Sequence, residues 1–431
     1  MGTRRRGIAA VVLSVAAGAA SVPAQALDLQ ELARKVEQLE QRVESAEARA
    51  ARSEAQLRTT ESKLQATEQE LQTLRTQSDG MQQQIAVTGE MLERAETQLS
   101  QGGVNNWAQN TRIGAYGELH FNNTNLTDQI DFHRFVAYLS HEFSDRLRFF
   151  SEVELEHSLA GDGKPGEVEL EQAYIEYDLT ETLATQVGLF LIPVGILNQT
   201  HEPDTFYGVE RNRVEQEIIP TTWWEAGAGL TGELLPGLSF DVAVHSGLSV
   251  PTEGGNAFRI RSGRQKVAEA PAEDPAYTGR LRYALMPGVE IAATVQFQED
   301  LTQSDPMTDT ASAWLYETHL VVERGPFDLR ALYARWDIDG DEAKMIGRDE
   351  QYGWYVEPGW RFNEHLGIFV RYSEWDTFDG NSADTTFKDR TAGLNWWLHP
   401  RVVLKFDYMD RLVPGGKDEH GFNLGMGFSF E

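Results

Sequence analysis

Cysteine is absent from the 431 residues, so the chain can form no disulfide bond, thiolate metal site or cysteine nucleophile. Basic residues are scarce: 38 Lys and Arg stand against 67 Asp and Glu, for a net charge of -29. Such a chain is a poor general binder of nucleic acid, because phosphate recognition depends on Lys and Arg. Long apolar runs are also missing, and a hydrophobic content of 41% excludes a helical protein with many membrane spans.

Glycine and aromatic residues, by contrast, are abundant: the chain has 38 Gly, 10 Trp, 13 Tyr and 20 Phe. In a membrane β-barrel only alternate residues of each strand face lipid, so a polar chain can still present an apolar outer wall. A β-barrel in an outer membrane therefore reconciles the polar composition with the aromatic content.

The N-terminus has the pattern of a secretory signal peptide over residues 1–26. Arg4, Arg5 and Arg6 precede a short apolar run from Ile8 to Ala20, and Ala24-Gln25-Ala26 is a small-x-small cleavage site. A membrane anchor is the alternative, but the run is shorter than the ~20 residues that a span needs. Export of a cysteine-free chain is typical of a bacterial envelope protein.

A heptad pattern follows and predicts a coiled-coil stalk over residues 27–103. Between residues 29 and 99 one register holds, and 16 of its 21 seam positions are apolar. A repeat of 3.5 residues over ten heptads is typical of a coiled coil. A single amphipathic helix lying on the barrel is the alternative. The seam does not determine the number of chains; three is favoured by the barrel argument below.

Beyond Gly102-Gly103 the periodicity changes to two, which predicts β-strands. At 289–298, for example, Val289, Ile291 and Val295 alternate with polar residues. Sixteen candidate strands start near residues 112, 131, 146, 169, 183, 223, 238, 276, 288, 311, 326, 350, 365, 386, 400 and 420. Short turns alternate with longer polar loops near 122–130, 158–167, 196–222, 249–275, 299–310, 338–349, 376–386 and 411–419.

This asymmetry predicts the fold class: a transmembrane, antiparallel, all-β barrel of 16 strands over residues 104–431, with tight periplasmic turns and long outer loops. An even strand number places both barrel ends on the short-turn side, so the stalk is expected in the periplasm. A soluble sandwich would not need so many strands. Aromatic residues near strand ends are expected to form a membrane girdle: Trp223, Trp224, Trp354, Trp360, Trp396 and Trp397.

The third outer loop, 196–222, is long and charged, and we expect it to fold into the lumen and narrow it. An outer cap is the alternative. Its candidate constriction residues are His201, Glu202, Asp204, Arg211, Arg213, Glu215 and Glu217. Strand parity further predicts charges that point into the lumen: Arg112, Arg134, Arg148, Glu152, Glu154, Arg280, Arg282 and Lys405.

Four segments together resemble the phosphate-selective porin O and P family: residues 131–135 (DFHRF), 141–146 (HEFSDR), 188–195 (GLFLIPVG) and 221–225 (TTWWE). The resemblance spans roughly residues 110–431 and implies a trimeric outer-membrane porin with 16 strands. Phosphate selection in that family rests on a lumen rich in Arg and Lys. Here the inward Arg residues are matched by Glu residues, so a mixed-charge lumen with weak selectivity is expected.

We therefore expect a water-filled channel for small hydrophilic solutes, including anions. No catalytic motif such as Gly-x-Ser-x-Gly, His-Glu-x-x-His or a Walker A loop occurs, so neither an enzyme nor a cofactor is expected. His120 with Glu118, and His319 with Glu317, have chelating spacing, but polar lumen residues are favoured over a metal site. Expected partners are outer-membrane lipid, lipopolysaccharide and further copies of the chain. The alternative function is a structural one, in which the stalk tethers the outer membrane to peptidoglycan.

Overall fold

The computed structural model describes Glu37, Gln72 and residues 107–158, 163, 165–303 and 310–430. The chain divides into two compact units, Met1–Val104 and Asn105–Glu431. In the first unit the two described residues are helical. The predicted signal peptide and the predicted coiled coil otherwise lie outside the described residues.

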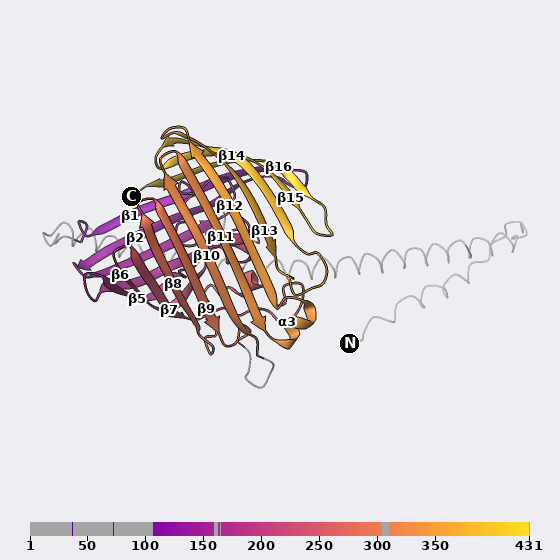
Figure 1. Cartoon of the computed structure of the whole chain (residues 1–431), viewed down its shortest axis with the longest axis horizontal. Helices are drawn as coiled ribbons and strands as arrows, with labels where there is room; N and C mark the ends of the chain where they lie inside the picture. The colour runs from indigo at the N-terminus through magenta and orange to yellow at the C-terminus, as the bar shows by residue number, and fades with distance from the viewer. Residues whose placement is uncertain are drawn as a thin grey trace, which may run out of the picture. The chain divides into compact units, whose positions relative to one another are not determined.

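In the second unit, sixteen antiparallel strands of the described residues form one closed barrel, in which β1 pairs with β16 (Figure 1). The predicted 16-stranded barrel is confirmed, and each predicted strand start lies within three residues of the observed one. The strands are β1 (Thr111–Thr124), β2 (Asp128–Ser144), β3 (Leu147–Glu156), β4 (Val168–Asp178), β5 (Leu183–Leu191), β6 (Trp224–Leu235), β7 (Leu238–His245), β8 (Ala276–Met286), β9 (Val289–Gln298), β10 (Ser312–Arg324), β11 (Phe327–Asp339), β12 (Glu350–Arg361), β13 (Leu366–Asp376), β14 (Phe387–His399), β15 (Val402–Leu412) and β16 (Glu419–Phe430).

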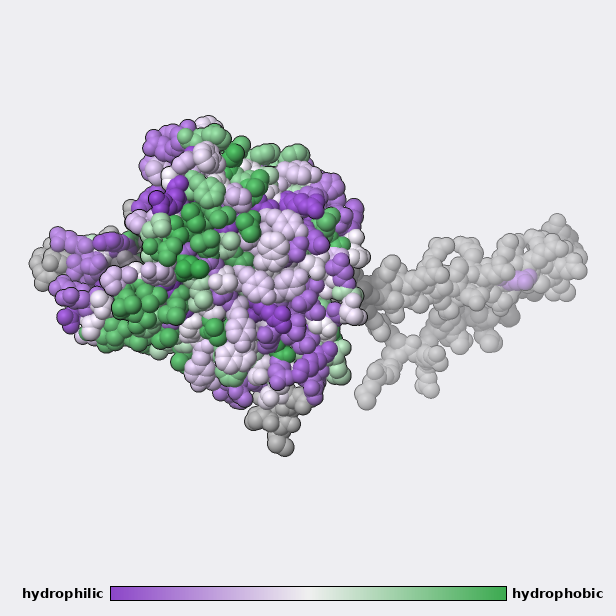
Figure 2. All heavy atoms as spheres, in the orientation of Figure 1, coloured by the Kyte–Doolittle hydropathy of each residue, from purple (hydrophilic) through white to green (hydrophobic). Residues whose placement is uncertain are grey.

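The barrel wall is apolar outside and polar inside, the reverse of a soluble β protein. In β9, Ile291 and Val295 are 49% and 41% exposed, whereas Thr294 and Gln296, on either side of Val295, are buried. Hydrophobic residues gather in patches on the wall that faces the viewer in Figure 2. An apolar outer surface of this kind is what a lipid environment requires of a barrel. Of the helices described, none is long and apolar enough to cross a membrane.

The connections divide the barrel into a short-turn end and a long-loop end. At the short-turn end, two residues join β2 to β3, β6 to β7 and β8 to β9. The connection at 122–130, expected to be a longer loop, is instead a tight turn at 125–127. The Thr124 hydroxyl accepts hydrogen bonds from the backbone N–H groups of Leu126 and Thr127, and this closes the turn.

Among the described residues, three short helices lie in long-loop connections: α2 (Val214–Glu217), the 3₁₀ helix η1 (Ile260–Gly263) and α3 (Asp341–Ile346). Two of these connections, residues 192–223 and 246–275, supply apolar side chains to a cluster inside the barrel. Ile218 and Ile260 pack in this cluster with Trp223 and Trp336, the latter from β11. The barrel therefore has an internal hydrophobic core, contributed by its loops and by inward residues of β5, β7 and β10–β13.

The predicted tryptophan girdle is only partly correct. Trp360 and Trp396 are 45% and 50% exposed on the wall. Trp223, Trp224 and Trp397, however, are buried. They are buried because the 192–223 and 246–275 loops enter the barrel and cover them: the Trp223 and Trp336 rings lie 6.2 Å apart, the Arg264 guanidinium covers Trp224, and Trp397 packs against Tyr207.

Candidate functional site

The connection between β5 and β6, residues 192–223, which we call the lumen loop, lies inside the barrel. Its backbone and side chains contact inward residues of strands on several sides of the wall. Val209 N–H donates to Asp407 of β15 at 2.6 Å, and the Trp336 indole of β11 donates to the Ile218 carbonyl at 2.9 Å. Gln199 accepts a hydrogen bond from Arg280 of β8 at 2.6 Å. The loop thus spans the interior rather than capping the barrel.

Glu215, one of the predicted constriction residues, holds the loop in place. Its carboxylate is 3% exposed and accepts hydrogen bonds from the N–H groups of Ile196 (2.9 Å) and Leu197 (2.6 Å). The hydroxyl of Tyr355 donates to the other carboxylate oxygen at 2.7 Å. Glu215 is therefore an anchor between the start of the loop, α2 and β12.

Asn198 closes the base of the lumen loop. Its side-chain amide donates to the carbonyls of Ile192 and Trp223, and its oxygen accepts the Trp223 N–H at 2.7 Å. A single side chain thereby joins both ends of the loop, because Ile192 and Trp223 are its first and last residues.

His201 and Glu202 lie on the side of the lumen loop nearest β1 and β2. His201 is buried, with its Nε2 2.7 Å from the Tyr116 hydroxyl. The predicted lumen residue Arg134 donates to the His201 carbonyl at 2.6 Å and to Glu118 at 2.6 Å. Burial and then the charges of Arg211 and Arg134 hold the pKa of His201 well below its usual value. Burial, reinforced by the charge of Asp204, raises the pKa of Glu202.

Asp204 and Lys405 lie where the loop meets β15 and β16. Asp204 accepts a hydrogen bond from the Ser429 hydroxyl at 2.9 Å. The Lys405 ammonium is buried and lies 3.6 Å from the centre of the Phe206 ring. Lys405, predicted as a lumen charge, thus contacts the loop through a cation–π interaction.

The other predicted lumen charges form local pairs rather than facing rows of opposite sign. Arg148 binds Glu176 and Asp178 of β4, and both Arg280 and Arg282 reach Asp241 of β7. Arg112, at the short-turn end, is 72% exposed and 4.0 Å from Glu142. Glu152 accepts a hydrogen bond from Gln172, and Glu154 is buried. Because the arginines are neutralised close by, they contribute little long-range field.

Four arginines around the lumen loop differ from these pairs. Arg211 and Arg213 of the loop, with Arg261 and Arg264 of the 246–275 connection, line one cavity of about 360 Å³. Arg211 donates to the Thr222 hydroxyl, Arg261 to the Gln216 carbonyl, and Arg264 to the carbonyls of Thr221 and Thr222. Among the described residues, no ion pair joins any of the four to a carboxylate. Burial, together with the nearby Arg134, lowers the pKa of Arg211 to about 10, so it stays charged at neutral pH.

Glu217 pairs with Arg259, which belongs to the same connection as Arg261 and Arg264. The sequence interpretation treated this connection as an ordinary outer loop and missed its arginines. The available signal was the alternation of Arg259, Arg261 and Arg264 with apolar Phe258 and Ile260, because apolar loop residues indicate a loop that packs inward.

Polar cavities lie on both faces of the lumen loop. Toward the long-loop end, residues 209–213 line cavities of about 290 and 360 Å³. Toward the short-turn end, Gln199 and Thr205 line a cavity of about 690 Å³ with Arg280, Arg282 and Arg330. Three groups of described side chains have metal-ligand spacing: Asp131 with His133 and His157, Glu152 with Glu171 and His201, and Glu154 with Glu156 and Glu169.

Comparison with known proteins supports the barrel and its class. A sequence model of the family named phosphate-selective porin O and P matches residues 114–418. An uncharacterised protein of Aquifex aeolicus (strain VF5) is 27% identical over 349 residues, which cover 74% of this chain and 79% of that protein.

Solved structures share the fold at low identity. The outer membrane channel DcaP of Acinetobacter baumannii gives a TM-score of 0.53 at 13% identity, over 74% of this chain and 97% of that one. The anion-selective porin from Comamonas acidovorans gives 0.52 at 11% identity, over 74% and 100%. The trimer form of OmpT of Vibrio cholerae gives 0.51 at 8% identity, over 74% and 99%.

Proposed function

This chain belongs to the phosphate-selective porin O and P family, and on that premise we propose that it forms a water-filled channel for passive diffusion of small hydrophilic solutes, with a weak preference for anions. Family and fold indicate an outer-membrane channel rather than an enzyme. The remaining question is which solutes the lumen favours, and the charges around the lumen loop bear on it.

One observation carries the anion preference: Arg211, Arg213, Arg261 and Arg264 surround a single cavity and form no ion pair with a described carboxylate. At 6 Å in water, a unit charge stabilises an anion by about 0.7 kcal/mol, which raises its local concentration about threefold. The four guanidiniums therefore favour anions at the loop even though the whole chain is acidic.

The preference is weak because carboxylates share the same space. Six glutamates line the same cavity as the four arginines: Glu118, Glu154, Glu156, Glu167, Glu169 and Glu210. Four of them have other partners, because Glu118 pairs with Arg134, Glu210 with His120, and Glu167 and Glu169 with Lys266. The inward arginines of the wall are mostly neutralised by neighbours, as Arg134 is by Glu118. A continuous ladder of unpaired cations, which strong phosphate selection would need, is not present among the described wall residues. The passage therefore discriminates by size and modestly by charge.

Reversal potentials in a potassium chloride gradient across planar bilayers test this proposal. Arg213→Gln combined with Arg261→Gln should move the permeability ratio toward cations by about threefold or more. Arg390→Gln is the matched control. Arg390 lies at the long-loop end on the outward face of β14, where it pairs with Asp410 of β15. An unchanged ratio in the double variant would refute the arginine argument, and block by micromolar phosphate would refute weak selectivity.

Self-association and envelope contacts complete the proposal. We propose a homotrimer, supported by the trimer form of the OmpT neighbour, with lipopolysaccharide around the acidic outer loops. The proposed periplasmic stalk rests on the heptad pattern of residues 29–99 alone. Deletion of residues 28–100 should leave conductance intact, and envelope blebbing in that strain would indicate tethering to peptidoglycan. Loss of conductance would contradict a separate stalk.

A further inference from the structure

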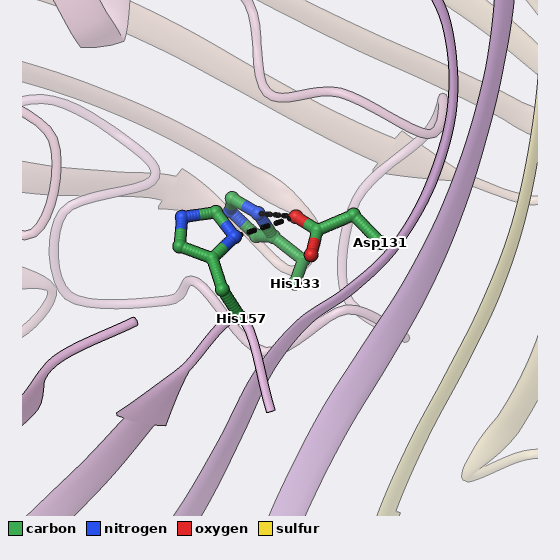
Figure 3. Close-up of side chains that lie close together, drawn as sticks. All are labelled: Asp131, His133 and His157. Carbon is green, nitrogen blue, oxygen red and sulfur yellow. Dashed lines mark hydrogen bonds and ion pairs between the residues drawn. The ribbon is translucent and has the colours of Figure 1, made fainter. Parts of the chain in front are cut away.

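Asp131, His133 and His157 converge at the long-loop end of the barrel, inside its mouth. Asp131 and His133 belong to β2, and His157 directly follows β3. Figure 3 shows both imidazole rings directed at the carboxylate of Asp131. All three residues line the cavity of about 290 Å³. Their side chains are 18%, 38% and 29% exposed, so small ions in the lumen can reach them.

Two local departures from regular strand geometry bring these side chains together. The pairing of β1 with β2 shifts between Glu118 and His120, which inserts an extra residue into β2. This bulge lets both His133 and Arg134 point into the lumen, although neighbouring residues of a strand normally face opposite sides. His157 has a positive φ of 52°, a conformation uncommon outside glycine, and its ring thereby turns back toward Asp131.

The spacing of the ligand atoms fits one metal ion. Oδ2 of Asp131 lies 2.7 Å from Nδ1 of His157 and 3.4 Å from Nδ1 of His133. Ligand atoms bound at about 2.0–2.1 Å in octahedral or tetrahedral geometry lie about 2.8–3.4 Å from one another, so the His133 contact fits as it stands and the His157 contact has to lengthen by about 0.1 Å. Moreover, both rings direct Nδ1 at the same carboxylate oxygen, although Asp131 has two.

The surroundings hold the rings without competing for the ion. The ring of His133 stacks on that of His120 with centroids 4.8 Å apart. His120 is itself fixed, because its Nδ1 faces Glu210 at 3.0 Å and its Nε2 faces Glu118 at 3.2 Å. Supporting contacts that orient a ligand ring are typical of metal sites. His120 is therefore a support for His133 and not a fourth ligand.

We propose that Asp131, His133 and His157 bind a divalent first-row transition-metal ion at the outer mouth of the barrel. Two imidazole nitrogens and one carboxylate oxygen suit zinc, nickel or cobalt, whereas magnesium and calcium prefer oxygen ligands alone. Three protein ligands leave coordination positions open to water or an anionic solute. The effect of the ion on conductance rests on the proposed pore, but its binding does not.

Calorimetric titration of the full chain in detergent with zinc chloride, in excess magnesium, tests the binding. One zinc ion should bind per chain, and His133→Asn combined with His157→Asn should weaken the affinity about 100-fold or more. His365→Asn is the control, because His365 lies at the short-turn end and is exposed. If the double variant does not fold, Asp131→Asn replaces it with the same expected loss.

Zinc binding of equal affinity in the wild type and the ligand variants would overturn the site, as would displacement of zinc by magnesium. A second measurement separates this site from the pore. Zinc added at the outer side should raise the anion preference of the wild type in planar bilayers and leave the ligand variants unchanged. Site-dependent zinc binding without any effect on conductance would keep the metal site and contradict its effect on permeation, whereas zinc binding by a protein that conducts no ions would count against the proposed channel.

Discussion

Replacing Glu215 by Gln should release the lumen loop from the barrel wall. The carboxylate accepts hydrogen bonds from Ile196, Leu197 and Tyr355, all at 2.9 Å or less, and a longer one from Asn212. A glutamine keeps one acceptor oxygen, but its amide nitrogen then faces two donors in either orientation, and the charge is lost. Hydrogen bonds to charged groups contribute about 1.5–3 kcal/mol each, so the loop should lose about 3 kcal/mol.

A loss of that size raises the population of the displaced loop about 100-fold or more. The absence of cysteine allows a direct assay, because a single Val209→Cys reporter has no background. Val209 is 1% exposed, so a thiol reagent reacts with the reporter mainly when the loop opens. We expect the labelling rate of the Glu215→Gln protein to rise about 100-fold over the parent reporter, in step with more frequent conductance fluctuations.

Glu217→Gln is the matched control for this prediction. Glu217 lies two residues further along α2 and pairs only with Arg259 among the described residues. Its replacement should change labelling by less than about fivefold, because a partly exposed ion pair contributes at most about 1 kcal/mol. Equal labelling rates for the two glutamine variants would refute the view that Glu215 anchors the loop.

Three further outcomes are expected. Asn198→Ala leaves the Trp223 N–H without its acceptor and removes one of the two donors to each of the Ile192 and Trp223 carbonyls. Loop cleavage by protease in detergent should therefore rise by an amount equivalent to about 1–3 kcal/mol, and resistance equal to wild type would contradict the clamp. Gly188→Ala should lower the yield of heat-modifiable folded barrel, because Gly188 has a φ of 137° and a Cβ there would meet the Ala173 carbonyl. Gly279→Ala should fold normally, because a Cβ at Gly279 would have no neighbouring atom within 4 Å. Because the pKa of Glu202 is raised, its negative charge is lost at a higher pH than that of an ordinary glutamate. Acidification should therefore raise the anion preference at a pH above the usual range for glutamate. Reversal potentials of Glu202→Gln should lack this pH-dependent rise.

The strands could be predicted from the sequence because lipid outside and water inside impose a strict alternation. β9 shows why: Ile291 and Val295 must face lipid, so their neighbours must face the lumen. Turn residues such as Pro287 and Gly288 then mark the short connections. The same alternation predicts that Arg134 and Arg280, which lie within strands, face inward, and both side chains are buried.

The interior arrangement could not be predicted in the same way. Loop conformation depends on contacts distant in sequence, such as that of Glu215 with Tyr355, which no local pattern encodes. Trp223 and Trp397 were assigned to the girdle because they lie near strand ends. Trp223 belongs to the inward loop, however, and Trp397 lies on the inward side of β14, next to the exposed Trp396. The bulge at His133 likewise hid its side chain from a count of alternate residues.

The off-centre placement of the internal apolar cluster has a consequence for engineering. Its side chains come from β5, β7, β10–β13 and the two inward loops, whereas the polar cavity lined by His120, Arg371 and Asn423 lies against β1, β13 and β16. Shortening the loops to widen the passage would remove the material that keeps the interior rigid. Trimming individual side chains on the β1–β16 flank would enlarge the bore and leave that scaffold intact.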